Sequence, residues 1–216
     1  MPGRLVVFEG VEGAGKTTQL ERLALRLGRH GATVRTLREP GGTPAGDEIR
    51  ALLLRPGASI PPRSEALLFM ASRAALMEEQ VRPALGRGEV VLLDRFFLST
   101  YAYQVHGRGL PEREVRDANG FATGGLVPDV TVLLTLPVGD GLARAARRGD
   151  ADRMEQADRA FHDRVEDAFA RFADEAWQVT HPECGPIVAV RADGAVEDVE
   201  ERVWRVVVAA CPEVQG

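Results

Sequence analysis

The chain has 216 residues, a formal net charge of −5 at pH 7 and 44% hydrophobic residues. This length and composition predict a single compact domain over residues 1–216, with a sizeable core. The acidic balance excludes a broad basic face for nucleic acid, and no apolar run approaches the ~20 residues that span a bilayer. The N-terminal apolar run lacks a small-residue cleavage site, and neither cysteine has metal-ligand spacing. We therefore expect a cytoplasmic protein that binds neither nucleic acid nor membrane.

Short apolar runs alternate with amphipathic stretches along the chain. Five segments predict strands, at 5–10, 88–95, 129–136, 186–194 and 32–44, the last being a strand that enters a Pro/Gly turn. Helical spacing of apolar residues predicts helices over 16–30, over 64–86 with a perturbation at Pro83, and in a closing segment that places Val196, Val199, Val203 and Val207 on one side. Residues 177–187 have the pattern of a loop. The alternation predicts an α/β fold whose parallel sheet is covered on both faces, with ligands at the carboxyl ends of the strands.

The first predicted strand leads into a glycine-rich loop. Residues 10–17 read GVEGAGKT and match the pattern G-x4-G-K-[ST] without a mismatch. Such glycines let backbone N–H groups converge on phosphate oxygens, and the following helix adds its positive end. Lys16 is the only lysine in the chain, and its compact ammonium fits between β and γ phosphates. We predict a loop that binds a nucleoside triphosphate through Gly10, Val11, Glu12, Gly13, Ala14, Gly15, Lys16, Thr17 and Thr18.

The strand at 88–95 ends in LLDR, which indicates a metal site. Asp94 would hold Mg²⁺ directly or through water, and Thr17 would offer its hydroxyl to the same ion. Read alone, Asp94 could instead cap a turn beside a solvated Arg95. The glycine-rich loop favours the metal interpretation.

Arginines gather in residues 139–155, where Arg144, Arg147, Arg148 and Arg153 occur among acids. A charged helix is usually a solvated face, but in a chain that binds a triphosphate it is also typical of a lid. The arginines of a lid offset charge on the transferring phosphoryl group. The glycine-rich loop itself has no arginine, which favours the lid.

Phe69 and Arg73 are four residues apart and therefore share one face of the helix predicted over 64–86. Two interpretations are open. Phe69 is buried beneath a surface arginine, or the pair offers an aromatic plate and a donor to a flat ligand such as a base.

Together these motifs resemble thymidylate kinase. The resemblance rests on FEGVEGAGKTTQ (8–19), REPGGTPAGDEIR (38–50), FMASRA (69–74), LLDRF (92–96), STYAYQ (99–104) and ARRGDADRMEQ (146–156). It implies a P-loop NTPase fold with a five-stranded parallel sheet flanked by helices, a short arginine-rich lid over about 139–155 and a homodimer joined through helices. It also implies transfer of the γ-phosphoryl group of ATP to dTMP with Mg²⁺, a step towards dTTP.

The resemblance also assigns the acceptor side. Glu12 would accept a hydrogen bond from the 3′-hydroxyl of dTMP, and Arg95 would bind its phosphate. Phe69 would stack on thymine while Arg73 would hydrogen-bond the edge of the base. Further contacts would come from Arg38, Glu39, Pro40, Ser99, Tyr103 and Gln104.

The expected catalytic residues combine the two loops and the lid. They are Lys16, Asp94, Arg95, Arg148 and Arg153. Because its P-loop has no arginine, the chain resembles a bacterial group with catalytic arginines in the lid. Arg153 is the first choice for the phosphoryl contact, followed by Arg144 and Arg148. Glu9 is interpreted as structural, and Ala192 and Asp193 are expected near adenine, although RADG (191–194) is offset from the Asp-Ala pair of the family.

Two other functions remain open at this point. A kinase for another nucleoside monophosphate or for a nucleoside would share the P-loop and lid and differ at 69–73 and 99–104. A nucleotide-dependent switch or motor would also bind a triphosphate. Guanine-reading switches usually carry N-K-x-D, which a chain with one lysine lacks.

Overall fold

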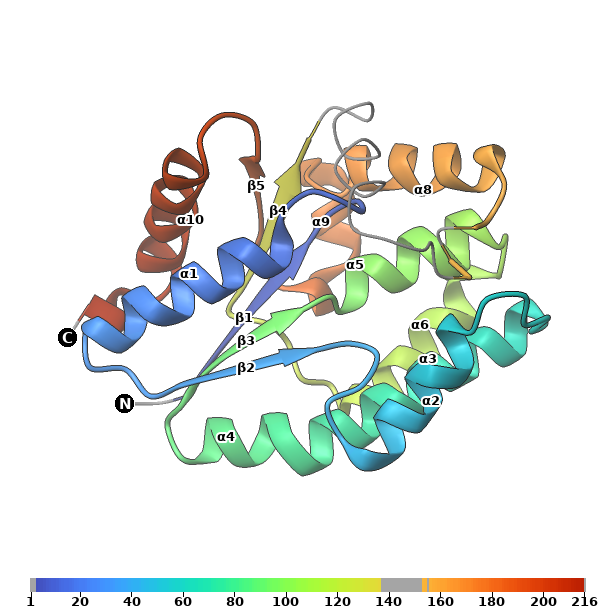
Figure 1. Ribbon diagram of the computed structural model, residues 1–216, viewed down its shortest axis with the longest axis horizontal. Coiled ribbons are helices and arrows are strands. Elements are labelled where there is room, and N and C mark those ends of the chain that lie inside the picture. The colour runs from blue at the N-terminus through green and yellow to red at the C-terminus, as the bar shows by residue number, and fades with distance from the viewer. Residues whose placement is uncertain (1–2, 137–152, 155, 216) are drawn as a thin grey trace.

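A single parallel sheet organises the chain (Figure 1). The computed structural model describes residues 3–136, 153–154 and 156–215. The strand order is β2-β3-β1-β4-β5, and every adjacent pair is parallel. The strands are β1 (Arg4–Glu9), β2 (Val34–Arg38), β3 (Val90–Asp94), β4 (Val130–Thr135) and β5 (Ile187–Arg191). The predicted fold class is confirmed, and each predicted strand is present.

The central strand is apolar on both faces because helices cover both sides of the sheet. Val6 and Phe8 pack into one core with α1 (Lys16–Arg29) and α10 (Val196–Ala210). Leu5 and Val7 point into the opposite core, which includes residues from the helices between β2 and β5. On α10, Val199, Val203 and Val207 are buried as predicted, but Val196 at its first turn is 42% exposed.

The remaining helical elements lie between β2 and β5 and after α10. They are α2 (Pro44–Leu54), α3 (Pro62–Leu76), η1 (Met77–Val81), α4 (Arg82–Gly86), α5 (Phe97–Thr100), η2 (Tyr101–Gly107), α6 (Glu112–Thr123), α8 (Arg159–Arg171), α9 (Glu175–Thr180), η3 (Pro182–Cys184) and η4 (Pro212–Gln215). No helix in these described ranges is long and apolar enough to cross a membrane.

The helix predicted over 64–86 is continuous but changes its hydrogen-bond pattern before Pro83. The π-helical turn η1 separates α3 from α4, and Pro83 lies in the first turn of α4. Proline has no N–H to donate and its ring crowds the carbonyl four residues earlier, so the wider turn relieves both problems. The perturbation was expected from the sequence, whereas its form was not.

The prediction of a loop over residues 177–187 is wrong. This stretch contains the end of α9, the turn η3 and the start of β5. Ring contacts explain why this stretch is regular structure rather than a loop. Trp177 stacks on His181 with ring centroids 3.8 Å apart, and both rings meet the Tyr101 ring edge-on. The sequence shows only proline and glycine turns here and gives no sign of these contacts.

Candidate active site

The loop between β1 and α1 wraps around the only lysine. Lys16 is buried, and its ammonium donates to the carbonyl oxygens of Gly10 (3.0 Å) and Val11 (2.9 Å). Burial, with the nearby Arg95 guanidinium, lowers the pKa of Lys16 to about 8. Gly10 has φ 137°, and a Cβ there would lie 2.4 Å from the carbonyl oxygen of Leu134. Only glycine therefore fits where this loop crosses β4.

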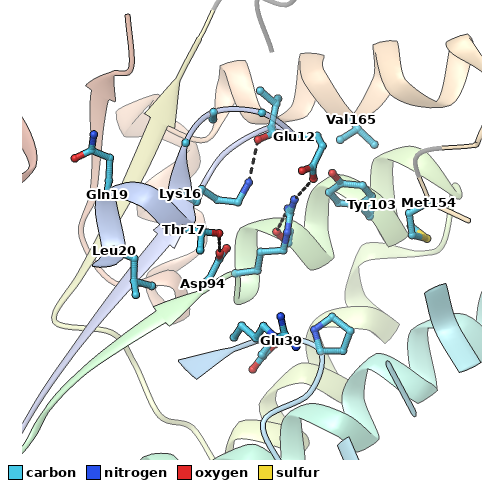
Figure 2. A pocket seen from close by; sticks show the side chains of 18 of the residues that line it. Glu12, Lys16, Thr17, Gln19, Leu20, Glu39, Asp94, Tyr103, Met154 and Val165 are labelled. Carbon is cyan, nitrogen blue, oxygen red and sulfur yellow. Dashed lines mark hydrogen bonds and ion pairs between the residues drawn. The ribbon is translucent and has the colours of Figure 1, made fainter. Parts of the chain in front are cut away.

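The two predicted metal ligands meet at the end of β3. The Thr17 hydroxyl donates to Asp94 Oδ2 over 2.8 Å (Figure 2). Hydroxyl and carboxylate oxygens suit a hard cation such as Mg²⁺. Within the described ranges, no three His, Cys, Asp or Glu side chains gather into a metal site. One or two protein oxygens are the usual protein contribution to a Mg²⁺ site beside a nucleotide.

Arg95 ties the P-loop to the turn after β3. Its guanidinium donates to Glu12 Oε2 (2.9 Å) and to the Ser99 hydroxyl (3.0 Å), and it lies 5.5 Å from the centre of the Tyr103 ring. Figure 2 shows Glu12 turned towards Tyr103 and away from Lys16. Arg95 also has φ 72°, a left-handed conformation that is costly for arginine and typical of functional positions.

Glu9 holds this turn in place. Its carboxylate is fully buried and accepts hydrogen bonds from the N–H groups of Phe96 (2.7 Å) and Ser99 (3.0 Å) and from the Ser99 hydroxyl (2.7 Å). These contacts give Glu9 the structural role expected from the sequence.

On α3, Phe69 and Arg73 both line the cleft, as their spacing predicts. Arg73 is buried, which excludes the interpretation as a surface arginine. Its donors bind Glu39 Oε2 (2.7 Å), the Thr100 hydroxyl (2.9 Å), the Phe96 carbonyl (2.9 Å) and Asn119 Oδ1. This differs from the free donor that we expected at the edge of a base, because protein acceptors already occupy the guanidinium.

The turn after β2 brings further expected residues to the cleft. The Glu39–Pro40 peptide is cis, and both residues line the cleft together with Arg38. Burial raises the pKa of the Glu39 carboxyl, although Arg73 opposes this shift. The Arg38 side chain is exposed and has no hydrogen-bond or ion-pair partner among the described residues.

One continuous cleft of about 1440 Å³ joins these groups. Its lining also includes residues that sequence reasoning missed. They are chiefly Gln19 on α1, Arg50 and Leu54 on α2, Thr100 on α5, Met154 and Ala157, and Arg159, His162, Asp163, Val165 and Glu166 at the start of α8. Thr100 and Arg50 lie inside quoted motifs and could have been found there. The α8 residues carry no distinctive pattern, and only their position after DRME points to the cleft.

Comparison with known proteins decides the family. The thymidylate kinase family model matches residues 8–192. The chain belongs to the thymidylate kinase family. It is 47% identical to a thymidylate kinase of Deinococcus radiodurans, over 95% of this chain and 96% of the relative. It is 46% identical to one of Thermomicrobium roseum, over 91% and 96%, and 48% identical to one of Pseudomonas putida, over 82% and 85%.

Arg153 does not lie where the thymidylate kinase resemblance led us to expect it. It does not line the cleft; its guanidinium pairs with Glu65 Oε2 (2.7 Å) and donates to the Leu53 carbonyl (2.6 Å). A buried carboxylate requires a positive partner, and Arg153 supplies it. Arg144 and Arg148, together with residues 139–152 and 155 of the expected lid, lie outside the described residues.

The thymidylate kinase match ends at the loop expected near adenine. Ala192 lines the cleft beside Gly194 and Val196. Asp193 does not line it, because its carboxylate binds Arg191 (2.6 Å) at the surface. The adenine contact proposed for Asp193 therefore lacks support in the structure, while Ala192 is well placed.

Proposed function

We propose that this kinase transfers the γ-phosphoryl group of ATP to dTMP, giving dTDP and ADP on the route to dTTP. The observation that carries the proposal is the single cleft between the P-loop and Phe69. Its volume of about 1440 Å³ exceeds the ~300–1,000 Å³ of a pocket for one ligand, so donor and acceptor fit side by side. We place the reaction in the cytoplasm, a reducing compartment in which Cys184 and Cys211 remain free thiols.

The donor end relies on charge rather than on covalent chemistry. Phosphoryl transfer needs alignment of the reactants and neutralisation of charge on the moving group. The P-loop, residues 10–18, would hold the triphosphate, and Lys16 would exchange its carbonyl partners for the β and γ phosphates. The phosphate of dTMP has a second pKa of ~6 and is already a nucleophile at neutral pH, so no general base is assigned.

The Thr17–Asp94 pair would hold Mg²⁺. A Mg²⁺ ion held there would supply positive charge that offsets the negative charge developing on the transferring phosphoryl group. Asp94 would orient the water around the ion, since its carboxylate lies at the end of β3 beside the P-loop.

At the acceptor end, different residues would recognise the sugar, the phosphate and the base of dTMP. Glu12 faces away from Lys16 and would accept a hydrogen bond from the 3′-hydroxyl of dTMP. Arg38, which has no partner among the residues that the structure describes, and the guanidinium of Arg95 would bind its phosphate. Phe69 would stack on thymine, while Tyr103 would exclude a ribose 2′-hydroxyl. Glu39, Pro40, Arg73, Ser99 and Gln104 would complete the pocket.

Catalytic arginines are proposed for residues 144–153. Arg148 becomes the first choice for contact with the transferring phosphoryl group, because Arg153 is engaged by Glu65. Arg144 remains the second.

The function is tested by ADP release from ATP with dTMP, dUMP, UMP, dCMP, dGMP and AMP in separate reactions, with and without Mg²⁺. We expect strong turnover with dTMP, weaker turnover with dUMP and none without Mg²⁺. UMP should fail because its 2′-hydroxyl meets Tyr103. Strong turnover with another acceptor would favour the alternative, a kinase for a different nucleoside monophosphate. Slow hydrolysis that no acceptor accelerates would reject a kinase.

We further propose a homodimer through α3 and α6. Leu67 on α3 is 63% exposed and Phe121 on α6 is 91% exposed. An apolar groove of about 140 Å³ lies between these helices, and the Arg63–Glu114 ion pair (2.8 Å) flanks it. An apolar centre with a charged rim is the usual anatomy of an interface, and a two-fold axis would bring the same face of a second copy onto it.

The double variant L67D/F121D is expected to sediment as a monomer where the unaltered protein sediments as a dimer, because two buried carboxylates would face their copies across the axis. Analytical ultracentrifugation checks this. The control is Leu25→Asp on α1, where a leucine is 64% exposed and the helix packs on the opposite side of the sheet from α3. A monomeric unaltered protein, or a double variant that still forms dimers, would count against this interface.

A further inference from the structure

The buried carboxylate of Glu65 on α3 is contacted by three side chains. Two of them lie on or just after η2, and the third is Arg153. Glu65 has no exposed surface. Its Oε1 accepts from Gln104 Nε2 (3.1 Å) and Arg108 Nε (3.1 Å), both on or just after η2. Its Oε2 accepts from Arg108 Nη2 (3.0 Å) and pairs with Arg153 Nη2 (2.7 Å). The two guanidinium groups compensate the buried charge, so this position is reserved for an anion.

The carboxylate determines which end of the Gln104 amide faces it. An ionised carboxylate can only accept hydrogen bonds, so Gln104 must present its NH₂ group to Glu65. The amide oxygen then points the other way. It accepts no hydrogen bond from the described residues. It is also not one of the fully buried polar atoms that lack a partner among those residues. Because Gln104 lines the cleft, this oxygen is available there as an acceptor.

We propose that Glu65 is a positioning residue that fixes the Gln104 amide with its oxygen towards the acceptor base. The inference rests on the proposed function and deepens it. Thymine and uracil carry an N–H at ring position 3, which can donate to this oxygen. Cytosine has a lone pair at the same position, so two acceptors would face each other and neither would be satisfied. Glu65 thus makes the cleft select a base with an N–H donor, although it lies behind the groups that line the cleft.

The test compares kcat/KM for dTMP, dUMP and dCMP in the unaltered enzyme and in E65Q. A glutamine at position 65 has nearly the same shape and can offer either a carbonyl or an NH₂ group, so Gln104 becomes free to turn over. The ratio of kcat/KM for dTMP to that for dCMP should fall by about tenfold or more. The ratio of dTMP to dUMP should not change, because both bases carry the N–H, and a general loss of order would lower all three rates together.

A folded E65Q that keeps the dTMP-to-dCMP ratio would overturn the role of Glu65. If E65Q alone does not fold, the double variant E65Q/R153Q removes one charge of each sign and restores the local balance, with the same fall in the ratio expected. In a Q104M background, which has no amide to orient, E65Q should not change the ratio further; a further fall would show that Glu65 acts by another route. An unaltered enzyme without activity on dTMP would instead reject the proposed function itself.

Discussion

Replacing Lys16 with methionine should lower kcat by about 10³-fold, the largest effect we expect from any single substitution. Lys16 is the only side-chain cation inside the P-loop, and its ammonium lies at the strand–helix junction where the triphosphate is proposed to bind. Methionine keeps the length and the apolar stem, so the loss falls on charge and hydrogen bonding alone. Single-turnover formation of dTDP at saturating ATP and dTMP measures the effect.

Two measurements separate catalysis from folding in this variant. Lys16 donates to two carbonyl oxygens in the P-loop. Its loss removes this donor from the Gly10 carbonyl, at a cost of about 1–3 kcal/mol, while the Val11 carbonyl keeps the Ala14 N–H (3.3 Å). A thermal melt of K16M should therefore show a modest drop in Tm while the protein stays folded. Lys16→Arg serves as the charge-matched control. Its kcat should also be low, because a planar guanidinium does not fit the narrow loop that holds the lysine ammonium. A fully active K16R would show that any cation suffices there.

Substituting Arg95 with methionine should raise the KM for dTMP by about 10²-fold and change the KM for ATP much less. Its guanidinium is held by Glu12 and Ser99, and a bidentate bond from it to the acceptor phosphate is proposed. Removing it also leaves the Glu12 carboxylate near an incoming anion, which adds repulsion. Steady-state kinetics with each substrate varied in turn checks the split.

The matched control for R95M is Ser99→Ala. It removes one hydroxyl, which accepts from Arg95 and donates to Glu9, and leaves the guanidinium and its pairing with Glu12. We expect an effect below tenfold on the KM for dTMP, because the guanidinium keeps its charge and its pairing with Glu12. Equal losses in both variants would mean that Arg95 acts mainly through Ser99, and no change in R95M would remove it from the acceptor site.

The fold was predictable because its signals are local. Apart from the edge strand β2 (VRTLR), each strand is a short, largely apolar run that ends at a turn or a charged residue, as buried parallel strands require. The P-loop was predictable for the same reason, since strand, glycines, lysine and helix follow one another within residues 5–30. Motifs at the ends of β1, β2 and β3 met in one cleft because parallel strands all end at the same edge of the sheet.

What the sequence did not reveal depends on partners far along the chain. Arg153 is recognisable as a cation, but nothing near it identifies Glu65 as its partner. In the sequence, Arg73 likewise has the pattern of a free donor. Only the structure shows that Glu39 and Asn119 accept its hydrogen bonds. In both cases a buried charge is satisfied by tertiary packing, which periodicity and short motifs do not encode.

The buried lysine also makes the P-loop open to chemical footprinting. Lys16 carries the only side-chain amine in the chain, and a pKa of about 8 leaves part of it as a nucleophilic free amine in mildly alkaline buffer. Acylation by an amine-reactive reagent therefore has one side-chain target besides the α-amine of the chain, and mass spectrometry of the peptide that contains Lys16 separates the two. A nucleotide held in the loop would shield that amine and restore its proton, so the acylated fraction becomes a direct readout of P-loop occupancy that needs no turnover.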